Sequence, residues 1–456
     1  MQAIVTPDEM AAIDAAAPES VEVLIERAGW AVARAALELL GGTYGKRVVV
    51  LAGKGNNGND GRAAARFLTT RGVRCTVVDA AAAPAALPEA DLVIDAAYGT
   101  GFQGHYRPPD LADVRTPVLA VDIPSGIDGV TGEAADDVLT ALQTVTFAAV
   151  KPGLLLADGS ERAGEVTVAD IGLDVSGATA HLVESADLKA WMPPRPRAAH
   201  KWQTATWLVA GSPGMSGAAH LAARAAQRGG AGYVRCSTPG GSIEGGPIEA
   251  VTTELPADDW AREIIEDSGR FSAIAVGPGL GTDSRTAEQV RSLVSETTLP
   301  IVVDGDGLRA LGQQAGRVIA ARPPGAAAVV LTPHDGEFEA LSGSVPPADR
   351  FAAVRRLAVT AGAVVLLKGP TTLVAEPDGS VLAVTAGDHR LATAGTGDVL
   401  TGLVVALLAQ GMAPPQAAAA AAHLHGAAGA LACPRGLVAG DLLDHLPIVL
   451  TAAFGA

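Results

Sequence analysis

Two glycine-rich segments of this chain carry amide or carboxylate side chains where an apolar run gives way to a helical pattern. Gly53–Gly61 holds two adjacent asparagines and an aspartate, and Ala394–Val399 holds Asp398. Free backbone N–H groups at a helix start bind anions, and glycines let a phosphate group approach. Beside such an anion site, Asp398 is placed to accept a hydroxyl proton during phosphoryl transfer. The alternatives are a tight turn and an aspartate that only favours the helix dipole.

Two aspartates of the first half, Asp95 and Asp122, each end an apolar run and precede a glycine-containing loop. The carboxyl ends of parallel strands share one edge of a sheet, so we expect both side chains to converge there. Oxygen groups such as those of Asn57, Asp95 and Ser125 suit a hard cation, and Asp122 then remains to act as a base. Taken singly, each aspartate is better explained as a helix N-cap or a turn residue. Three such loops in series favour a site.

Polar residues follow apolar runs in the second half as well. The segments are Gly277–Gly281, Asp304–Asp306, Leu331–Phe338 and Leu367–Thr372. Lys368 is one of only six lysines in the chain, and beside Thr371 and Thr372 it is predicted to bind nucleotide phosphate. We expect His334 to line the substrate pocket. The alternative is a structural histidine whose hydrogen bonds are satisfied.

The elements that position these residues follow from the apolar pattern. Thr6, Pro7 and Glu9 predict a capped helix start. Short β-branched runs then alternate with alanine-rich helical stretches, which is typical of βαβ units and predicts a mostly parallel sheet in an α/β fold. Strands are predicted at 48–51, 75–78, 92–95, 118–122 and 145–147, with helices at 21–40 and 62–70.

A second α/β series begins after residues 191–200, where clustered prolines exclude a helix or a central strand. Its strands are predicted at 206–210, 273–276, 301–303, 329–331, 364–367 and 380–384, and its closing helices at 399–410 and 416–431. We therefore predict two different domains, residues 1–190 and 201–456, joined by a linker at 191–200.

Composition narrows the class of protein. The formal net charge is −16, and neither half is basic, so nucleic acid is not an expected partner. Hydrophobic residues make up 48% and charged residues 18% of the chain, which indicates an ordered globular protein. Three widely spaced cysteines argue against a disulfide framework and favour a reducing cytoplasm. The first residues show no signal-peptide pattern, and no apolar stretch is long enough for a membrane span.

The first-half motifs resemble the NAD(P)HX epimerase family, which interconverts the two epimers of hydrated nicotinamide cofactor. The resemblance covers most of residues 1–190 and implies a Rossmann-like, three-layer α/β/α domain. The segments that carry it are Gly53–Gly61, Ile94–Gly101, Val121–Gly129 and Phe147–Gly153.

This resemblance implies a potassium ion held by Asn57, Asp95 and Ser125, and contact of Asp122 with the substrate. Asn59 stands where the family usually has glycine, so we expect either a strained positive φ or crowding of the pyrophosphate there. The other residues implied to contact the hydrated dinucleotide are Asn56, Asn57, Gly58, Asn59, Asp60, Gly99, Thr100, Gly101, Phe102, Gln103, Gly104 and His105.

The second-half motifs resemble the ADP/ATP-dependent NAD(P)HX dehydratase family, a branch of the ribokinase-like fold, from about His200 to the C-terminus. Trp202 stands where that family usually has glycine, so we expect a disturbed loop at the domain entry. The residues implied to contact the hydrated cofactor are Ala218, Gly279, His334 and Asp398. Those implied to bind ADP or ATP, with Mg²⁺, are Lys368, Gly369, Pro370, Thr371, Thr372 and Gly397.

In this interpretation Asp398 deprotonates the C6 hydroxyl, the hydroxyl takes the terminal phosphoryl group, and loss of phosphate restores the nicotinamide ring. Together the two resemblances predict a bifunctional repair enzyme of the cytoplasm. The alternative is a ribokinase-like vitamin or sugar kinase whose first domain only binds. The sequence permits a homo-oligomer but sets no subunit number, and it does not decide between ADP and ATP or between the NADH and NADPH forms.

Overall fold

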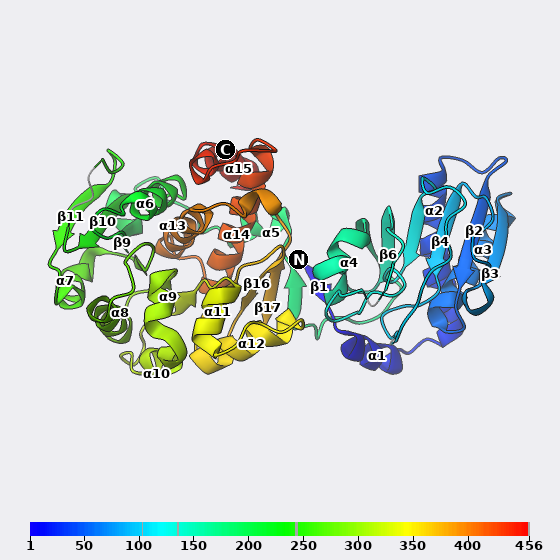
Figure 1. Cartoon of the computed structure of the whole chain (residues 1–456), viewed down its shortest axis with the longest axis horizontal. Coiled ribbons are helices and arrows are strands. Elements are labelled where there is room, and N and C mark those ends of the chain that lie inside the picture. The colour runs from blue at the N-terminus through cyan, green and yellow to red at the C-terminus, as the bar shows by residue number, and fades with distance from the viewer. Residues whose placement is uncertain (103, 135, 242–244, 455–456) are drawn as a thin grey trace. The chain divides into compact units, whose positions relative to one another are not determined.

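In the computed structural model, which describes residues 1–102, 104–134, 136–241 and 245–454, the chain folds as two compact units (Figure 1). The first unit is Gln2–His181, and the second is Leu182–Ala456 together with Met1. Helix α5 (Ser185–Trp191) packs against α14 (Pro414–Leu431) and α15 (Ala439–Phe454) of the second unit. The division therefore falls before the segment 191–200.

The first unit is built on a parallel sheet whose strand order is β3-β2-β4-β5-β6-β7. These strands are β2 (Arg47–Ala52), β3 (Arg74–Asp79), β4 (Leu92–Ala96), β5 (Val118–Val121), β6 (Gln143–Phe147) and β7 (Glu165–Ala169). Short strands β1 (Gln2–Ile4) and β8 (Ala180–Leu182) lie near the ends of the unit. The parallel sheet predicted from the apolar runs is confirmed. Strand β7 was not predicted, because its partly buried residues form no continuous apolar run.

Alternate strand residues of this sheet face different layers. Val48 and Val50 pack with helices α2 (Val21–Leu40) and α3 (Asn56–Thr70), whereas Val49 and Leu51 pack with connecting segments on the other face. The remaining helices of the unit are α1 (Pro7–Ala16) and α4 (Ala157–Arg162). The predicted cap of α1 is confirmed, since Thr6 Oγ1 accepts from Glu9 N at 3.2 Å and Thr6 N donates to Glu9 Oε2 at 2.7 Å.

The second unit is built on a larger sheet in the order β17-β16-β15-β14-β13-β12-β9-β10-β11. Strands β9 to β15 are parallel to one another, and β16 is antiparallel to both of its neighbours, β15 and β17. The strands are β9 (Ala205–Val209), β10 (Tyr233–Pro239), β11 (Val251–Leu255), β12 (Ala273–Val276), β13 (Ile301–Val303), β14 (Val329–Leu331), β15 (Val364–Leu367), β16 (Thr372–Ala375) and β17 (Val381–Val384). Strands β10, β11 and β16 were not predicted.

Helices cover both faces of this sheet (Figure 1). One face carries α6 (Gly217–Arg228), α13 (Thr396–Ala409), α14 and α15, whose small side chains form the main core. A Cβ on Gly402 of α13 would lie 2.2 Å from the carbonyl oxygen of Ala222 in α6, so the two helices cross in close contact. The remaining helices are α7 (Trp260–Asp267), α8 (Ser284–Glu296), α9 (Asp306–Leu311), α10 (Ala315–Ala320), α11 (Asp335–Ser342) and α12 (Arg350–Ala361).

Trp202 lies at the amino ends of the strands of the second unit, just before β9. Its ring packs on Tyr233 with centroids 4.3 Å apart, and the Arg270 guanidinium lies 3.9 Å from its ring centroid. Because the carboxyl ends carry the motifs discussed below, Trp202 occupies the opposite edge of the sheet from them. The loop in which a disturbance was expected from Trp202 therefore lies away from the candidate site of the second unit. No helix within the described residues is both long and apolar enough to cross a bilayer.

Candidate active sites

The glycine-rich motif of the first unit is a short turn followed by the first turns of α3. This helix begins at Asn56, well before the predicted start at residue 62. A Cβ on Gly58 would lie 2.0 Å from the carbonyl oxygen of Gly53, and Arg62 Nη1 donates to the same oxygen at 2.6 Å. Gly58 therefore allows the helix to pack closely against the turn. This packing keeps the N–H groups at the helix start accessible to a ligand.

Replacing Gly58 by alanine is expected to destabilise the first unit by about 3 kcal/mol, since the added methyl group meets backbone atoms that cannot yield locally. Urea denaturation followed by circular dichroism measures this change. Gly42→Ala is the matched control, because its Cβ would meet nothing within 4 Å. Equal stability of the two variants would contradict the packing described for Gly58.

Asn59 does not produce the strain that its place in a glycine motif suggests. It lies inside α3 with a helical backbone, and its N–H donates to the carbonyl oxygen of Gly55 at 3.1 Å. It is not among the described non-glycine residues with positive φ. The expectation of a positive φ at Asn59 is therefore wrong, because the helix begins three residues before it.

A cavity of about 830 Å³ lies at the carboxyl edge of the first sheet. Of the residues predicted for this site, those that line it are Asn56, Asn57, Asp60, Gly99, Thr100, Gly101, Phe102 and Asp122. Gly58, Asn59, Gly104 and His105 are not among its lining residues, and the exposed His105 instead lies 3.1 Å from Asp136. Gln103 lies outside the described residues. Helices α1 and α2 supply the apolar wall of this cavity. This wall was not predicted, because the sequence motifs mark only strand ends.

Asp122 is held as a carboxylate by the groups around it. Its Oδ1 lies 2.9 Å from the Nζ of Lys151, which is 1% exposed, and accepts from Thr146 Oγ1 at 3.2 Å. Its Oδ2 accepts from Thr100 N at 3.0 Å. Burial alone would raise the pKa of Asp122, but the Lys151 ammonium and the Thr100 donor together lower that pKa below its usual value. An ionised Asp122 at the cavity wall is suited to accept a proton.

The three oxygen groups predicted to hold a cation lie around Tyr98 and Gly99. Ser125 Oγ donates to Asp95 Oδ1 at 2.7 Å and accepts from Tyr98 N at 2.9 Å. Asn57 lies against Gly99, and its buried side-chain oxygen and nitrogen have no hydrogen-bond partner within the described part of the chain. A buried amide oxygen without a donor, near a fully buried carboxylate, fits a monovalent or divalent cation.

In the second unit, Asp304 joins three segments at the carboxyl edge of the sheet. Its Oδ1 lies 2.9 Å from Lys368 Nζ and accepts from Thr332 Oγ1 at 2.8 Å, and its Oδ2 accepts from Thr401 Oγ1 at 2.6 Å. Lys368 Nζ also lies 3.3 Å from Glu337 Oε2. The ends of β13, β14 and β15 and the start of α13 are thereby fixed to one another. Asp304 and Glu337 lie within the segments Asp304–Asp306 and Leu331–Phe338 noted in the sequence, but no role was predicted for either residue.

The start of α13 brings Gly397 and Asp398 to this network. A Cβ on Gly397 would lie 3.7 Å from Lys368 Nζ, so the ammonium stands beside the free N–H groups of the helix start. Burial and the nearby Asp304 carboxylate, opposed in part by the Lys368 ammonium, raise the pKa of Asp398 to about 7. A carboxyl with a pKa near neutral is matched to proton transfer at physiological pH.

Other predicted residues of the second unit fall into two groups. Ala218, at the start of α6, faces Gly279, where an added Cβ would lie 3.2 Å from the Ala218 Cβ. His334 caps α11: its Nδ1 accepts from Gly336 N at 3.0 Å, while its ring is half exposed. His334 therefore has the structural role of a helix cap. The exposed edge of its ring stays open to a ligand. Gly369, Pro370 and Thr371 connect β15 to β16, and Thr372 is the first residue of β16.

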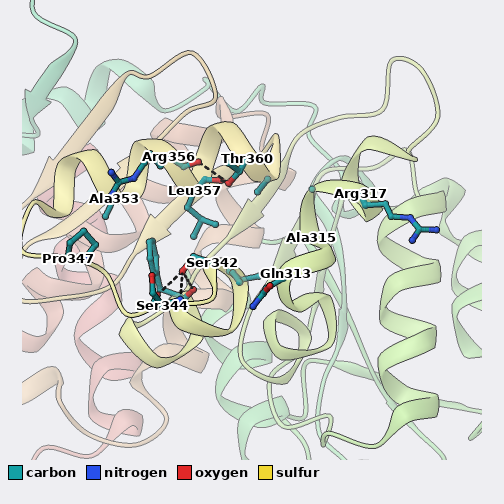
Figure 2. A pocket seen from close by; sticks show the side chains of 14 residues that line it. Gln313, Ala315, Arg317, Ser342, Ser344, Pro347, Ala353, Arg356, Leu357 and Thr360 are labelled. Carbon is teal, nitrogen blue, oxygen red and sulfur yellow. Dashed lines mark hydrogen bonds between the residues drawn. The ribbon is translucent and has the colours of Figure 1, made fainter.

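A second cavity of about 610 Å³ lies among α10, α11 and α12, away from these residues (Figure 2). Ser342 and Leu357 line it, and the Arg317 side chain points away from it in the view shown. None of the residues predicted for either site lines this cavity.

The fold and the two sites together define an enzyme of two α/β domains: one with a carboxylate-lined cavity, and one in which an anion site adjoins a basic and an acidic side chain. Known proteins agree with this class. The family described as NAD(P)H-hydrate dehydratase matches residues 206–449, and the family described as YjeF-related protein N-terminus matches residues 21–85 and 78–153.

Relatives of similar length carry both domains. The bifunctional NAD(P)H-hydrate repair enzyme of Salinibacter ruber is 38% identical over 95% of this chain and 92% of its own length. That of Moorella thermoacetica is 36% identical over 98% of this chain and 96% of its own length. The chain belongs to the family of bifunctional NAD(P)H-hydrate repair enzymes.

Solved structures match the second unit. The ADP/ATP-dependent NAD(P)H-hydrate dehydratase from Bacillus subtilis, co-crystallised with ATP and Mg²⁺, is 29% identical with a TM-score of 0.51, over 59% of this chain and 97% of that chain. A ribokinase-like superfamily protein from Enterococcus faecalis gives a TM-score of 0.52 at 22% identity, over 61% of this chain and 98% of that chain. The predicted ribokinase-like fold of the second half is confirmed.

Proposed function

We propose that the first unit epimerises hydrated NADH and NADPH through the cavity around Asp122, and that the second unit dehydrates one epimer through Asp398. The chain is thus a bifunctional NAD(P)H-hydrate repair enzyme, an epimerase and an ADP- or ATP-dependent dehydratase. The observation that carries the division of labour is the presence of two separate carboxylate sites, one within each compact unit. Each site has its own lysine paired with a buried aspartate or a cavity-lining aspartate: Lys368 with Asp304, and Lys151 with Asp122.

In the dehydratase, Asp398 takes the proton of the C6 hydroxyl of the hydrated ring while that oxygen attacks the terminal phosphoryl group of the nucleotide. Lys368, steadied by Asp304 and Glu337, and the backbone N–H groups at Gly397 neutralise charge on the transferring group. Mg²⁺ supplies further charge neutralisation when it is bound with the nucleotide. Elimination of phosphate from C6, with loss of a proton from C5, then regenerates NADH or NADPH.

The proposed binding contacts of the second unit lie in two parts of the carboxyl edge of its sheet. We assign the hydrated cofactor to Ala218, Gly279 and the exposed ring edge of His334, because Ala218 and Gly279 lie against each other and the His334 ring is half exposed. We assign the adenine nucleotide to the segment Lys368–Thr372 and to Gly397. Lys368 and Gly397 support this assignment because they are neighbours in space although they are distant in sequence.

Phosphate stoichiometry tests this proposal against a sugar or vitamin kinase. We expect one inorganic phosphate to be released for each reduced cofactor regenerated, because the phosphorylated hydroxyl is only an intermediate. A colorimetric phosphate assay run beside cofactor absorbance gives both quantities. A stable phosphorylated alcohol with no free phosphate would contradict the dehydratase assignment and favour the kinase.

In the epimerase, we propose that Asn57, Asp95 and Ser125 hold a potassium ion near the substrate. The support is the unpartnered buried amide of Asn57 and the buried carboxyl of Asp95, which among the described residues accepts hydrogen bonds only from Ser125 and the Ala97 amide. A cation held by these three residues would supply positive charge at the carboxyl edge of the sheet. The other proposed contacts are made by the cavity-lining residues of α3 and of Gly99–Phe102.

Asn57→Ala and Asp95→Ala are each expected to raise the potassium concentration needed for half-maximal epimerisation by about tenfold or more, because each removes one oxygen ligand. Initial rates of epimer exchange at increasing KCl, with constant ionic strength, measure this change. Dehydration of the accepted epimer serves as the internal control and stays unchanged. Loss of dehydration with retained epimerisation would reverse the assignment of the two units.

A further inference from the structure

Two carboxyl groups of the first-unit cavity, Asp60 and Asp122, have opposite surroundings. Asp60 projects from α3, is 7% exposed and lines the cavity. Within the described residues its carboxyl has no hydrogen-bond donor and no cation partner at ion-pair distance. Asp122 of the same cavity is bonded to Lys151, Thr146 and Thr100. One carboxyl is therefore stabilised as an anion, and the other is not.

The charged groups around Asp60 favour its protonated form. Burial, together with the neighbouring Asp122 and Asp14 carboxyl groups, raises the pKa of Asp60 to about 8. Tyr98 and Lys151 also line the cavity, and the Lys151 ammonium is already engaged by Asp122, Thr146 and the carbonyl oxygen of Phe147. Two carboxyl groups whose surroundings drive their protonation states apart are the usual arrangement of a general acid and a general base.

We propose that Asp60 is the general acid of epimerisation, acting with Asp122 as the base to open and reclose the hydrated nicotinamide ring. This proposal rests on the proposed function of the first unit. Apolar side chains such as Met10, Leu24 and Phe147 line the same cavity as the two carboxyl groups.

The reaction needs no further reactant. Asp122 takes the proton of the C6 hydroxyl, the C6–O bond becomes a carbonyl, and the C6–N1 bond breaks. Its electron pair goes to N1, which receives the proton of Asp60. After rotation about the C5–C6 bond, N1 attacks the other face of the carbonyl and returns its proton to Asp60, while the oxygen regains its proton from Asp122. The product is the other epimer, with both carboxyl groups in their initial states.

Ring opening uses one proton donor and one proton acceptor at the same time, which matches the cavity. Two ionised carboxylates would offer no proton to N1, and two protonated ones would accept none from the hydroxyl. The C–N bond is therefore the one that these two side chains are placed to break.

Asp60→Asn in the full-length chain tests the proposal, with Asp60→Glu as a second variant that retains a proton donor. Exchange between the two epimers of hydrated NADH is followed by chromatography without ADP or ATP, and binding of hydrated NADH is measured by calorimetry. We expect Asp60→Asn to lower kcat about 100-fold or more while the dissociation constant changes less than about threefold. Asp60→Glu is expected to recover part of the rate. Glu38→Gln, an exposed carboxyl of α2 outside the cavity lining, is the control.

The pH profile distinguishes a general acid from a purely structural side chain. The rate of the wild-type chain is expected to fall as the pH rises through about 8, where Asp60 loses its proton. The residual rate of Asp60→Asn lacks this decrease. Wild-type rates in Asp60→Asn, or an unchanged alkaline decrease in that variant, would overturn the role of Asp60. Absence of epimer exchange in the wild-type chain would instead overturn the proposed function of the whole unit.

Discussion

Replacing Asp398 by asparagine is expected to lower the turnover number of dehydration by about a thousandfold, because only the proton acceptor for the C6 hydroxyl is lost. Asparagine keeps the size and position of the side chain at the start of α13, so the anion site of Gly397 and Lys368 remains. Binding of ADP and ATP, measured by calorimetry, should therefore be retained within about threefold. Epimer exchange in the first unit serves as an internal control for folding.

The pH dependence of the wild-type dehydratase follows from the same residue. Since Asp398 must be ionised to act as a base, the rate should fall about tenfold for each pH unit below about 7 and level off above it. Asp444→Asn changes an exposed carboxyl of α15 and should leave this profile unaltered. Substantial turnover in Asp398→Asn, or a pH profile with no change near 7, would remove Asp398 from the mechanism.

Asp122→Asn is expected to produce the reverse pattern, in which epimerisation falls about 100-fold or more and dehydration of the accepted epimer continues. Asp122 has a φ of 68°, a conformation that asparagine adopts as readily as aspartate, so the backbone is not strained by the change. Chromatographic separation of the epimers measures the effect directly. Normal epimer exchange in this variant would contradict the role of Asp122 as base.

A stability cost accompanies this substitution, because the buried Lys151 loses its carboxylate partner. Breaking a buried ion pair from one side costs about 3–5 kcal/mol of unfolding free energy. The double variant Asp122→Asn with Lys151→Met removes the unpaired charge and should regain most of this stability without regaining epimerisation. Recovery of epimerisation in the double variant would show that the first effect was one of folding alone.

Much of the fold was predictable from local pattern. The buried strands β13, β14 and β15 are continuous apolar runs, and their bounds agree with the prediction. Prediction failed where burial is partial or where a helix starts in a polar segment. The start of α3 was placed at residue 62 instead of Asn56, because its first turns contain glycines and asparagines of low helix propensity. Packing of Gly58 against Gly53 overrides that propensity.

The candidate sites were predictable to the extent that their residues stand at strand ends. Asp122 was found in this way, and Asp398 was found because a glycine motif marks the start of α13. The walls supplied by α1 and α2 were not, since no local motif says which helix face meets the strand edge. The coupling of Asp60 to Asp122 and Asp14 was also missed, because it depends on distances between groups on three separate elements.

The central claim is that one chain repairs both epimers of hydrated NADH, and absorbance of the reduced nicotinamide ring tests it most directly. Purified chain is added with potassium, Mg²⁺ and either ADP or ATP to a mixture of both epimers. We predict complete recovery of the absorbance, at a rate that slows to that of epimerisation once the accepted epimer is consumed. Recovery that stops at the fraction of that epimer would contradict epimerisation by the first unit, and no recovery with either nucleotide would contradict the dehydratase.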